Sequence, residues 1–173
     1  AHAVAYVMMA FRIAWFKVYH PLAFYAAYFS IRAKAFDLRI MTGDLKTQLT
    51  EFNRIKALDR AASPKDKDLM SALEVSMEMY QRGYRFINVD IQHSEARRFS
   101  IKDGALLPPF LAIDSLGETV ADAIVAEREE RPFTSLKDLQ RRCKVSNTII
   151  DLMKELKCCG ELPEDEQMSL FGA

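Results

Sequence analysis

The sequence predicts a mainly α-helical chain with one small β segment, and three observations support this prediction. Apolar residues recur at helical spacing through residues 1–82, alternate with polar residues between 86 and 101, and return to helical spacing over 113–160. Turn-forming residues separate these stretches. We therefore expect four segments: helices over 1–82, a small β segment over 83–109, two tandem helical hairpins over 110–160 and a flexible tail over 161–173.

The composition excludes several classes of protein. With 24 basic and 24 acidic residues the formal net charge is zero, so the overall charge does not indicate binding to nucleic acid. The three cysteines are odd in number and two are adjacent (Cys158 and Cys159), which argues against a disulfide framework or a zinc site. This pattern favours a reducing, cytoplasmic setting. Arg12 interrupts the first apolar stretch before the roughly twenty residues that a membrane span needs, so we expect no membrane partner.

Residues 1–82 are expected to form helices with recognisable ends. An amphipathic helix is predicted from the first residue, with Arg12 and Lys17 on its polar side. Since the sequence starts without methionine and inside this helix, we interpret it as a piece cut from a longer protein. Helix starts are predicted at Pro21, at Asp44 and at Ser63–Pro64, and a helix stop at Gly83. The apolar residues of the first helix are Val4, Val7, Met8, Phe11, Trp15 and Val18.

The β segment is predicted from a change of period. Phe86–Ile91 and Arg97–Ile101 alternate apolar and polar residues, as half-buried strands do. Asp103–Gly104 is typical of a hairpin turn, after which residues 105–107 can return as a strand. We expect an antiparallel sheet of two or three short strands that packs on neighbouring helices.

The first helical hairpin has a tight turn at Ile113–Gly117, followed by a helix. This resembles the second half of a helix-hairpin-helix, whose turn usually reads Gly-hydrophobic-Gly. Such a turn presents backbone N–H groups at a helix N-terminus, and these hold a DNA phosphate without reading sequence. Here a serine stands where the first glycine usually does, and Glu118 in the first turn of the helix repels phosphate. The candidate DNA-binding residues are Ser115, Leu116, Gly117 and Thr119.

The second hairpin, with a helix cap expected at Thr134, has the complementary property. Its turn over residues 143–146 has no glycine, but residues 133–160 carry six basic and three acidic residues. The first hairpin supplies the turn geometry and the second the positive field, so together they could grip two phosphates of a duplex. A helical pair that only packs is the alternative. The candidate DNA-binding residues here are Arg141, Arg142, Lys144, Ser146 (the expected helix cap) and Asn147.

The tail combines an acidic stretch with a short apolar cluster. Glu161–Glu166 has no basic residue and is too polar to fold alone, so we expect a flexible tether. Leu170 and Phe171 then follow, and apolar residues on a tail suggest a docking peptide. On shape alone, these two residues could equally fold back onto their own domain.

Several stretches, in order along the chain, resemble the C-terminal end of bacterial replicative DNA polymerase III alpha subunits, most closely the PolC type. The resemblance covers essentially the whole sequence. The stretches that carry it are Ala1–Tyr6, Phe16–Pro21, Tyr28–Ala33, Phe36–Leu38, Arg82–Arg85, Pro108–Phe110, Leu116–Glu118 and Gln167–Phe171.

The resemblance implies a function for each segment. Residues 1–82 would end the helical fingers domain, and the tandem helix-hairpin-helix region would contact duplex DNA. The terminal pentapeptide would dock on the sliding clamp (the beta subunit), with Leu170 and Phe171 as apolar anchors, Met168 in a shallower pocket, and Gln167 and Ser169 completing the motif. The parent would be a DNA-directed DNA polymerase, a nucleotidyltransferase. Its catalytic aspartates and Mg²⁺ would lie in an upstream palm domain, so we expect no catalytic residue, metal or cofactor in this chain.

Two other functions remain open from the sequence. The chain could be a free-standing helix-hairpin-helix DNA-binding module, which would need a complete Gly-hydrophobic-Gly turn. It could also be a scaffold that recruits the clamp and never contacts DNA. Binding to duplex DNA that weakens steeply as salt rises would favour the polymerase interpretation, because a scaffold that never contacts DNA shows no such dependence.

Overall fold

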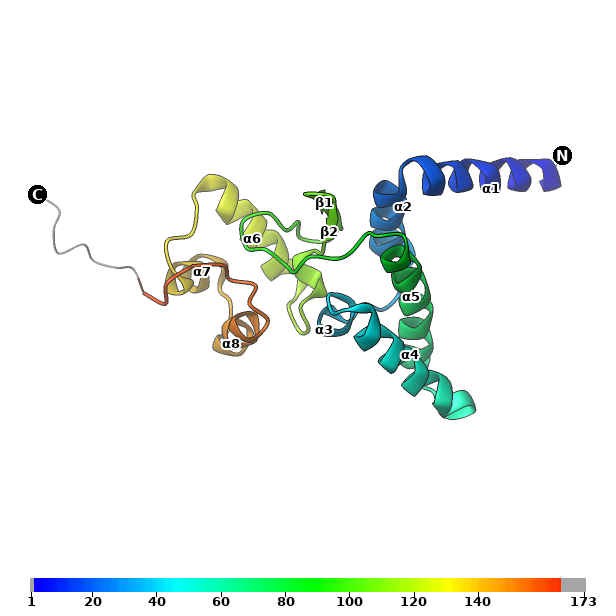
Figure 1. Cartoon of the computed structure of the whole chain (residues 1–173). Helices are drawn as coiled ribbons and strands as arrows, with labels where there is room; N and C mark the ends of the chain where they lie inside the picture. Colours follow the sequence, from blue (N-terminus) through cyan, green and yellow to red (C-terminus); the bar gives the residue numbers. More distant parts are fainter. Residues whose placement is uncertain (1, 166–173) are drawn as a thin grey trace, which may run out of the picture. The chain divides into compact units, whose positions relative to one another are not determined.

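The computed structural model describes residues 2–165 of the chain, and it divides them into two compact units (Figure 1). Unit 1 comprises residues 2–87 and 98–107. Unit 2 comprises residues 88–97 and 108–165. The β hairpin thus belongs to the same unit as the helices before it, whereas the loop of residues 88–97 belongs to the same unit as the helical hairpins.

Unit 1 is built from helices that begin where the sequence predicts. Pro21 is the first residue of α2, and the Asp44 and Ser63 side chains cap the starts of α4 and α5. At α5 the cap is reciprocal, because the Asp66 side chain also accepts from the Ser63 amide. Gly83, with a φ of 85°, follows the end of α5. The helices are α1 (His2–Tyr19), α2 (Pro21–Ala27), a π-helical turn (Tyr28–Arg32), α3 (Leu38–Met41), α4 (Leu45–Leu58), a 3₁₀ turn (Asp59–Ala61) and α5 (Pro64–Gln81).

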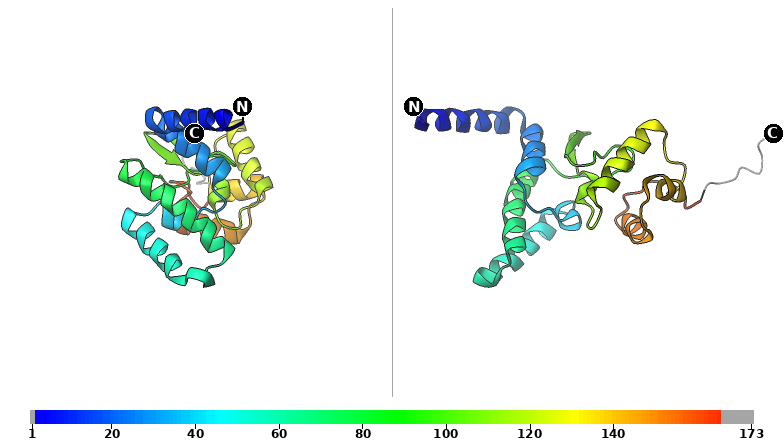
Figure 2. Two further views of the ribbon diagram at one scale, coloured as in Figure 1. Left: turned by 90° about the vertical axis from the view of Figure 1, so that its right-hand side faces the viewer. Right: turned by 180° about the vertical axis from the view of Figure 1, so that it is seen from behind.

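The core of unit 1 lies between these helices and the β hairpin. The helices α4 and α5 pack side by side (Figures 1 and 2). Phe86 stands at the centre of an aromatic cluster, with ring centroids 4.9 Å from Phe29 and 5.1 Å from Phe36 in edge-to-face contact. Buried Gln48 is satisfied by Ser76 and by the carbonyl of Met41. The aromatic rings fix the hairpin segment to the helices.

The first helix departs from expectation. No residue of α1 is buried, although an amphipathic helix was predicted to cover one apolar face. Its large apolar side chains, including Phe11 at 72% exposure, point outward on all sides. A helix that is apolar all round is ordinarily buried, so the described residues do not supply its packing partner. None of the described helices is long and apolar enough to cross a membrane.

The sheet has two strands in the described residues, which agrees with the two or three that the sequence predicts. Strands β1 (Ser100–Lys102) and β2 (Ala105–Leu107) pair antiparallel around a turn in which Asp103 and Gly104 both have positive φ. The predicted strand Phe86–Ile91 is wrong: only Phe86 makes a bridge, to Leu106. Residues 88–91 belong to unit 2 instead, where Val89 and Ile91 are buried and none of the four residues is in a strand.

Unit 2 contains both helical hairpins. Its elements are a 3₁₀ turn (Phe110–Ala112), α6 (Glu118–Glu130), α7 (Leu136–Cys143) and α8 (Asn147–Glu155). Arg128 on α6 donates to the carbonyls of Ile91 and Ser94, which holds the 88–97 loop in place. Ser146 caps α8 as predicted. The predicted cap at Thr134 is wrong by one residue, because the Ser135 side chain accepts from the amide of Asp138 and caps α7.

Candidate nucleic-acid interface

The first hairpin turn has the backbone conformation that a phosphate-binding turn requires. Ser115 lies in the left-handed region with a φ of 63°, a conformation that glycine adopts most easily. Leu116 is buried and anchors the turn, whereas Ser115, Gly117 and Thr119 are exposed. Gly117 begins α6 without a side-chain cap. The start of α6 therefore has no side-chain cap for its amides and lies beside three small, exposed residues.

The carboxylates that would repel phosphate at this turn are paired. Arg97 forms ion pairs with Glu118 and Asp122, both at 2.5 Å. The hydrogen bonds from Arg97 lower the pKa of Asp122 below its usual value. Arg97 lies more than twenty residues before these partners in the sequence, and no sequence pattern identified it. The positive charge of Arg97 therefore offsets the acidic side chains that would otherwise repel phosphate at the first hairpin.

The second hairpin turn is built in the same way without glycine. Lys144 ends α7 with a φ of 54°, again in the left-handed region, and its side chain is exposed. Ser146 is exposed but its hydroxyl accepts from the Ile149 amide as a cap. The side-chain amide oxygen of Asn147 accepts from the Gln140 side chain, which ties the start of α8 to α7. Within residues 2–165, the ammonium group of Lys144 forms no ion pair.

Arg142 serves the structure of this hairpin rather than its surface. Its side chain is only 11% exposed and bonds to Glu127, to the Arg131 carbonyl and to the carboxylate of Asp138. The guanidinium also stacks on the Phe133 ring at 4.7 Å. Of the two candidate arginines, Arg141 is exposed and Arg142 is not. We therefore assign Arg142 a structural role.

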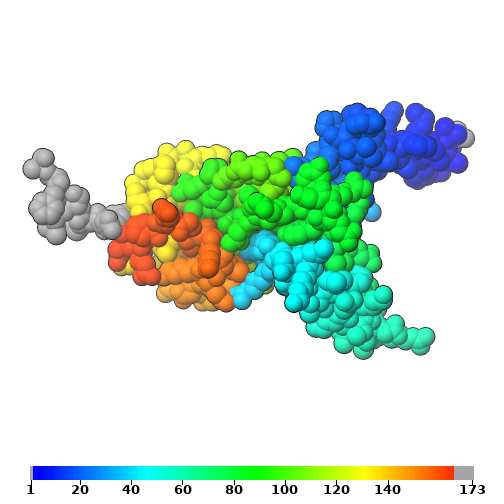
Figure 3. All heavy atoms as spheres, viewed as in Figure 1, coloured from blue at the N-terminus to red at the C-terminus, as the bar shows by residue number. Residues whose placement is uncertain are grey.

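The acidic segment after α8 lies against the second hairpin. The amides of Leu136 and Lys137 donate to the carbonyls of Pro163 and Glu164. Lys137 pairs with Asp165 at 2.5 Å, and Lys154 pairs with Glu164 at 2.7 Å. In Figure 3 the red atoms of this segment lie against the orange atoms of α8. The free tether expected over 161–166 is therefore wrong for residues 161–165, which the structure describes.

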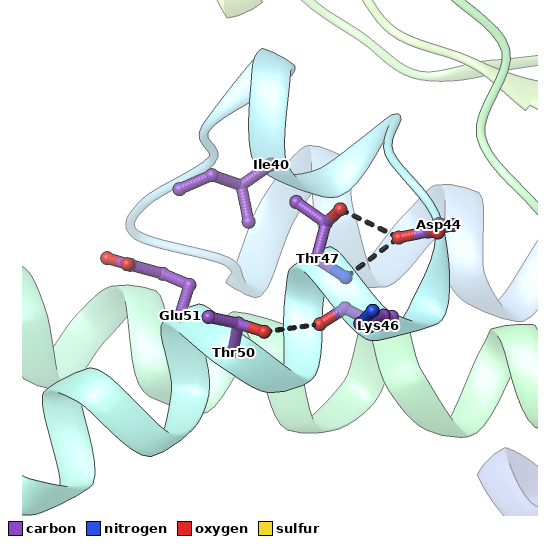
Figure 4. A pocket seen from close by; sticks show the side chains of 6 residues that line it. All are labelled: Ile40, Asp44, Lys46, Thr47, Thr50 and Glu51. Atoms are coloured by element: carbon purple, nitrogen blue, oxygen red, sulfur yellow. Dashed lines mark hydrogen bonds between the residues drawn. The ribbon is translucent and has the colours of Figure 1, made fainter.

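The described residues also include a hollow and buried cysteines away from the two hairpin turns. A hollow beside the start of α4 is lined by residues of α3 and α4, but its Asp44 carboxylate is engaged by Thr47 as a helix cap (Figure 4). Residues 2–165 contain no group of three or more His, Cys, Asp or Glu side chains that could hold a metal ion. Burial raises the pKa of the Cys158 thiol to about 12, so this cysteine is not a nucleophile at neutral pH.

The five residues of the predicted clamp motif, Gln167, Met168, Ser169, Leu170 and Phe171, lie outside the described residues. The expectation that they bind a clamp stays a prediction.

Comparisons with known proteins agree with this architecture. Residues 83–167 match a family model described as a helix-hairpin-helix motif. The chain is 47% identical over 171 residues to the DNA polymerase III PolC-type of Caldanaerobacter subterraneus subsp. tengcongensis. It is 47% identical over 173 residues to that of Streptococcus suis, and 45% identical over 174 residues to that of Streptococcus pyogenes. Each match covers 99% of this chain but 12% of the relative's length.

Proposed function

We propose that the chain is one segment of a PolC-type DNA polymerase III, and that this segment holds duplex DNA by its phosphate backbone and tethers the polymerase to the sliding clamp. The observation that carries the first part is the pair of hairpin turns. Each turn has a residue in the left-handed region, Ser115 or Lys144, three residues before the first residue of a helix. Exposed amides at a helix start bind anions without reading sequence, as a polymerase needs.

The two hairpins divide the work of binding. The first offers the uncapped N-terminus of α6, with its carboxylates paired by Arg97. The second offers exposed cations at Arg141 and Lys144. Because phosphate contacts carry no sequence information, the proposed grip is the same for every duplex.

A salt titration of duplex binding tests this proposal. The chain should bind a labelled duplex with an affinity that falls as salt rises, by about 0.9 in the log–log slope for each phosphate contact. Lys144→Gln should weaken binding to all sequences alike and reduce that slope by about one. Lys67→Gln, an exposed lysine of α5 in unit 1, is the matched control and should leave affinity and slope unchanged. Binding that ignores salt would contradict the proposal and favour a scaffold that never contacts DNA.

The types of residue near the end of the chain support clamp tethering. A glutamine, an aliphatic residue, a small polar residue and then Leu170–Phe171 form a short apolar peptide close to an acidic stretch. Two adjacent apolar anchors suit a shallow hydrophobic pocket on a partner. A tether of this kind raises the effective concentration of polymerase at the clamp without a tight contact.

Binding to a purified bacterial sliding clamp tests the tether. Micromolar-range affinity, roughly −8 kcal/mol, should be abolished by Leu170→Ala with Phe171→Ala. The paired change Leu49→Ala with Leu58→Ala, two exposed leucines of α4, is the control and should bind as the unaltered chain does. Clamp binding that survives the loss of Leu170 and Phe171 would place the contact elsewhere.

The chemistry of nucleotide transfer is proposed to belong to other parts of the parent polymerase, in the cytoplasm. Two metal ions held by aspartates drive such transfer, and we propose that Mg²⁺ acts there rather than in this segment. Primer extension by the purified chain would contradict this assignment.

A further inference from the structure

The acidic segment 161–165, here called the acidic strap, crosses the open end of the second hairpin. One lysine that it contacts, Lys137, lies in the first turn of α7, and the other, Lys154, lies in the last turn of α8. The strap is fixed by two backbone hydrogen bonds, from the amides of Leu136 and Lys137. It therefore has a defined place on the hairpin surface and is not held by charge alone.

The strap cancels the positive field of the second hairpin. Residues 133–160 carry six basic and three acidic residues, a net charge of +3. The strap adds Glu161, Glu164 and Asp165, a charge of −3, so the sum over 133–165 is zero. Two of the six cations are paired directly with strap carboxylates, and the two arginines are paired with Asp138. In residues 2–165 only Lys144 and Lys157 of this set form no ion pair.

We propose that the acidic strap is an autoinhibitory contact, which occupies cations of the second hairpin that duplex phosphates engage once it leaves. This rests on the proposed function, since it requires that the hairpin binds DNA. Carboxylates and phosphates compete for the same ammonium groups, so duplex binding and strap binding exclude each other at Lys137 and Lys154. While the strap is bound, the second hairpin therefore binds duplex DNA only weakly.

The strength of the contact suits a reversible device. In the Lys137–Asp165 pair the side chains are 69% and 62% exposed, and the carboxylate that pairs with Lys154 is 79% exposed. Ion pairs this exposed are individually weak and are screened by salt. A duplex that presents a row of phosphates can therefore displace them.

The affinity of the whole chain for a 20-base-pair duplex tests the proposal. Glu164→Gln with Asp165→Asn removes both strap carboxylates but keeps the strap's length and backbone. We expect this variant to bind about threefold to tenfold more tightly than the unaltered chain at low salt, the range that two exposed ion pairs represent. The gain should fade as salt screens the pairs.

Two matched variants separate the strap from a general charge effect. Glu129→Gln with Glu130→Gln removes the same charge from exposed positions at the end of α6, which make no ion pair in the described residues. This pair should leave affinity nearly unchanged. In a chain that also carries Lys137→Gln and Lys154→Gln, the strap substitutions should have no effect, because the lysines that they free are gone.

Amide hydrogen exchange follows the strap itself. In the unaltered chain, saturating duplex should speed exchange at Leu136 and Lys137, whose amides donate to the strap. Unchanged protection, or an equal gain in the α6 control, would overturn the proposal. If the unaltered chain and every variant fail to bind duplex at low salt, the proposed function itself fails, and the strap's role with it. Salt-dependent binding without a gain in the strap variant would contradict the strap alone.

Discussion

At the scale of single residues, Asp138 organises the second hairpin. Its carboxylate is fully buried, and it accepts from Arg131, Arg141, Arg142 and the Thr134 amide. Burial alone would raise its pKa, but the hydrogen bonds from Thr134 and the two helical arginines prevail and hold the pKa of Asp138 below its usual value. One buried acid thus ties the segment before α7 to the far end of that helix.

The Asp138 network predicts acid-sensitive stability in unit 2. Because the folded pKa is lowered, its contribution is present above the unfolded pKa of about 3.9 and is lost as pH falls through the folded value. We expect Asp138→Asn to lower the unfolding free energy by about 3 kcal/mol at pH 7, since it removes one of the two carboxylates that pair with the largely buried Arg142 guanidinium. Urea denaturation between pH 3 and 7 checks this.

Two outcomes of that titration are informative. The difference between the unaltered chain and Asp138→Asn should shrink as pH falls through the lowered pKa of Asp138, because protonation removes the charge of its carboxylate. Asp151→Asn, at an exposed position on α8, is the control and should change stability little. A gap that stays constant with pH would mean that Asp138 acts through packing and not through its charge.

The turn residue Ser115 gives a second prediction at this scale. A side chain at a φ of 63° costs about 1–2 kcal/mol, whereas glycine adds roughly 0.5–1 kcal/mol of unfolded-state entropy. Ser115→Gly should therefore stabilise unit 2 slightly, by about 0.5–1 kcal/mol. Thermal unfolding measures the change. Asp114→Gly, one residue earlier and outside the left-handed region, should only destabilise.

At the scale of elements, the capped starts of the helices fix where each helix begins. The reciprocal cap of α5 satisfies two amides, because Ser63 accepts from Asp66 and Asp66 accepts from Ser63. Both partners are three residues apart, so the sequence alone reveals the pair. The start of α5 is thus a local property of the chain.

Removing this cap should cost stability in unit 1. Ser63→Ala is expected to lower the unfolding free energy by about 1 kcal/mol, because it leaves helix-terminal amides unpaired. Ser71→Ala, in the middle of the same helix, should be neutral or slightly stabilising, since alanine is the better helix former there. Urea denaturation of the two variants gives the comparison, and an equal loss in both would contradict the capping role.

At the scale of the whole molecule, α1 is the element with the most unsatisfied surface. Its apolar side chains point outward on all sides, and no residue of the helix is buried. Large exposed apolar surface ordinarily marks an interaction site. The chain spans 12% of the length of the PolC-type relatives that it matches.

We expect the isolated chain to associate at high concentration through α1. Trp15, the single tryptophan, lies on this helix and is half exposed, so its emission should shift to the blue as the chain associates. Val7→Glu with Phe11→Glu should keep the chain monomeric in sedimentation velocity. Thr50→Glu with Asn53→Glu, which adds the same charge to exposed positions on α4, should not. A monodisperse unaltered chain at every concentration would contradict this expectation.

The sequence by itself determined the features that depend on neighbours along the chain. The mainly helical class, the β hairpin at Asp103–Gly104 and the caps at Asp44, Ser63 and Ser146 all follow from residues within four positions of one another. The single-residue error at Thr134 has the same origin, because Thr134 and Ser135 are both good caps and only the local backbone selects Ser135.

Only the tertiary structure decided the features that join distant residues. Alternation over Phe86–Ile91 predicted a strand, but within the described residues Phe86 makes the one bridge and packs in unit 1, whereas Val89 and Ile91 are buried in unit 2. Arg97 pairs with carboxylates more than twenty residues later, and the acidic strap finds Lys137 across a whole hairpin. Such contacts have no sequence period, because they depend on where folding places each side chain, and they set the charge of the candidate DNA-binding surface.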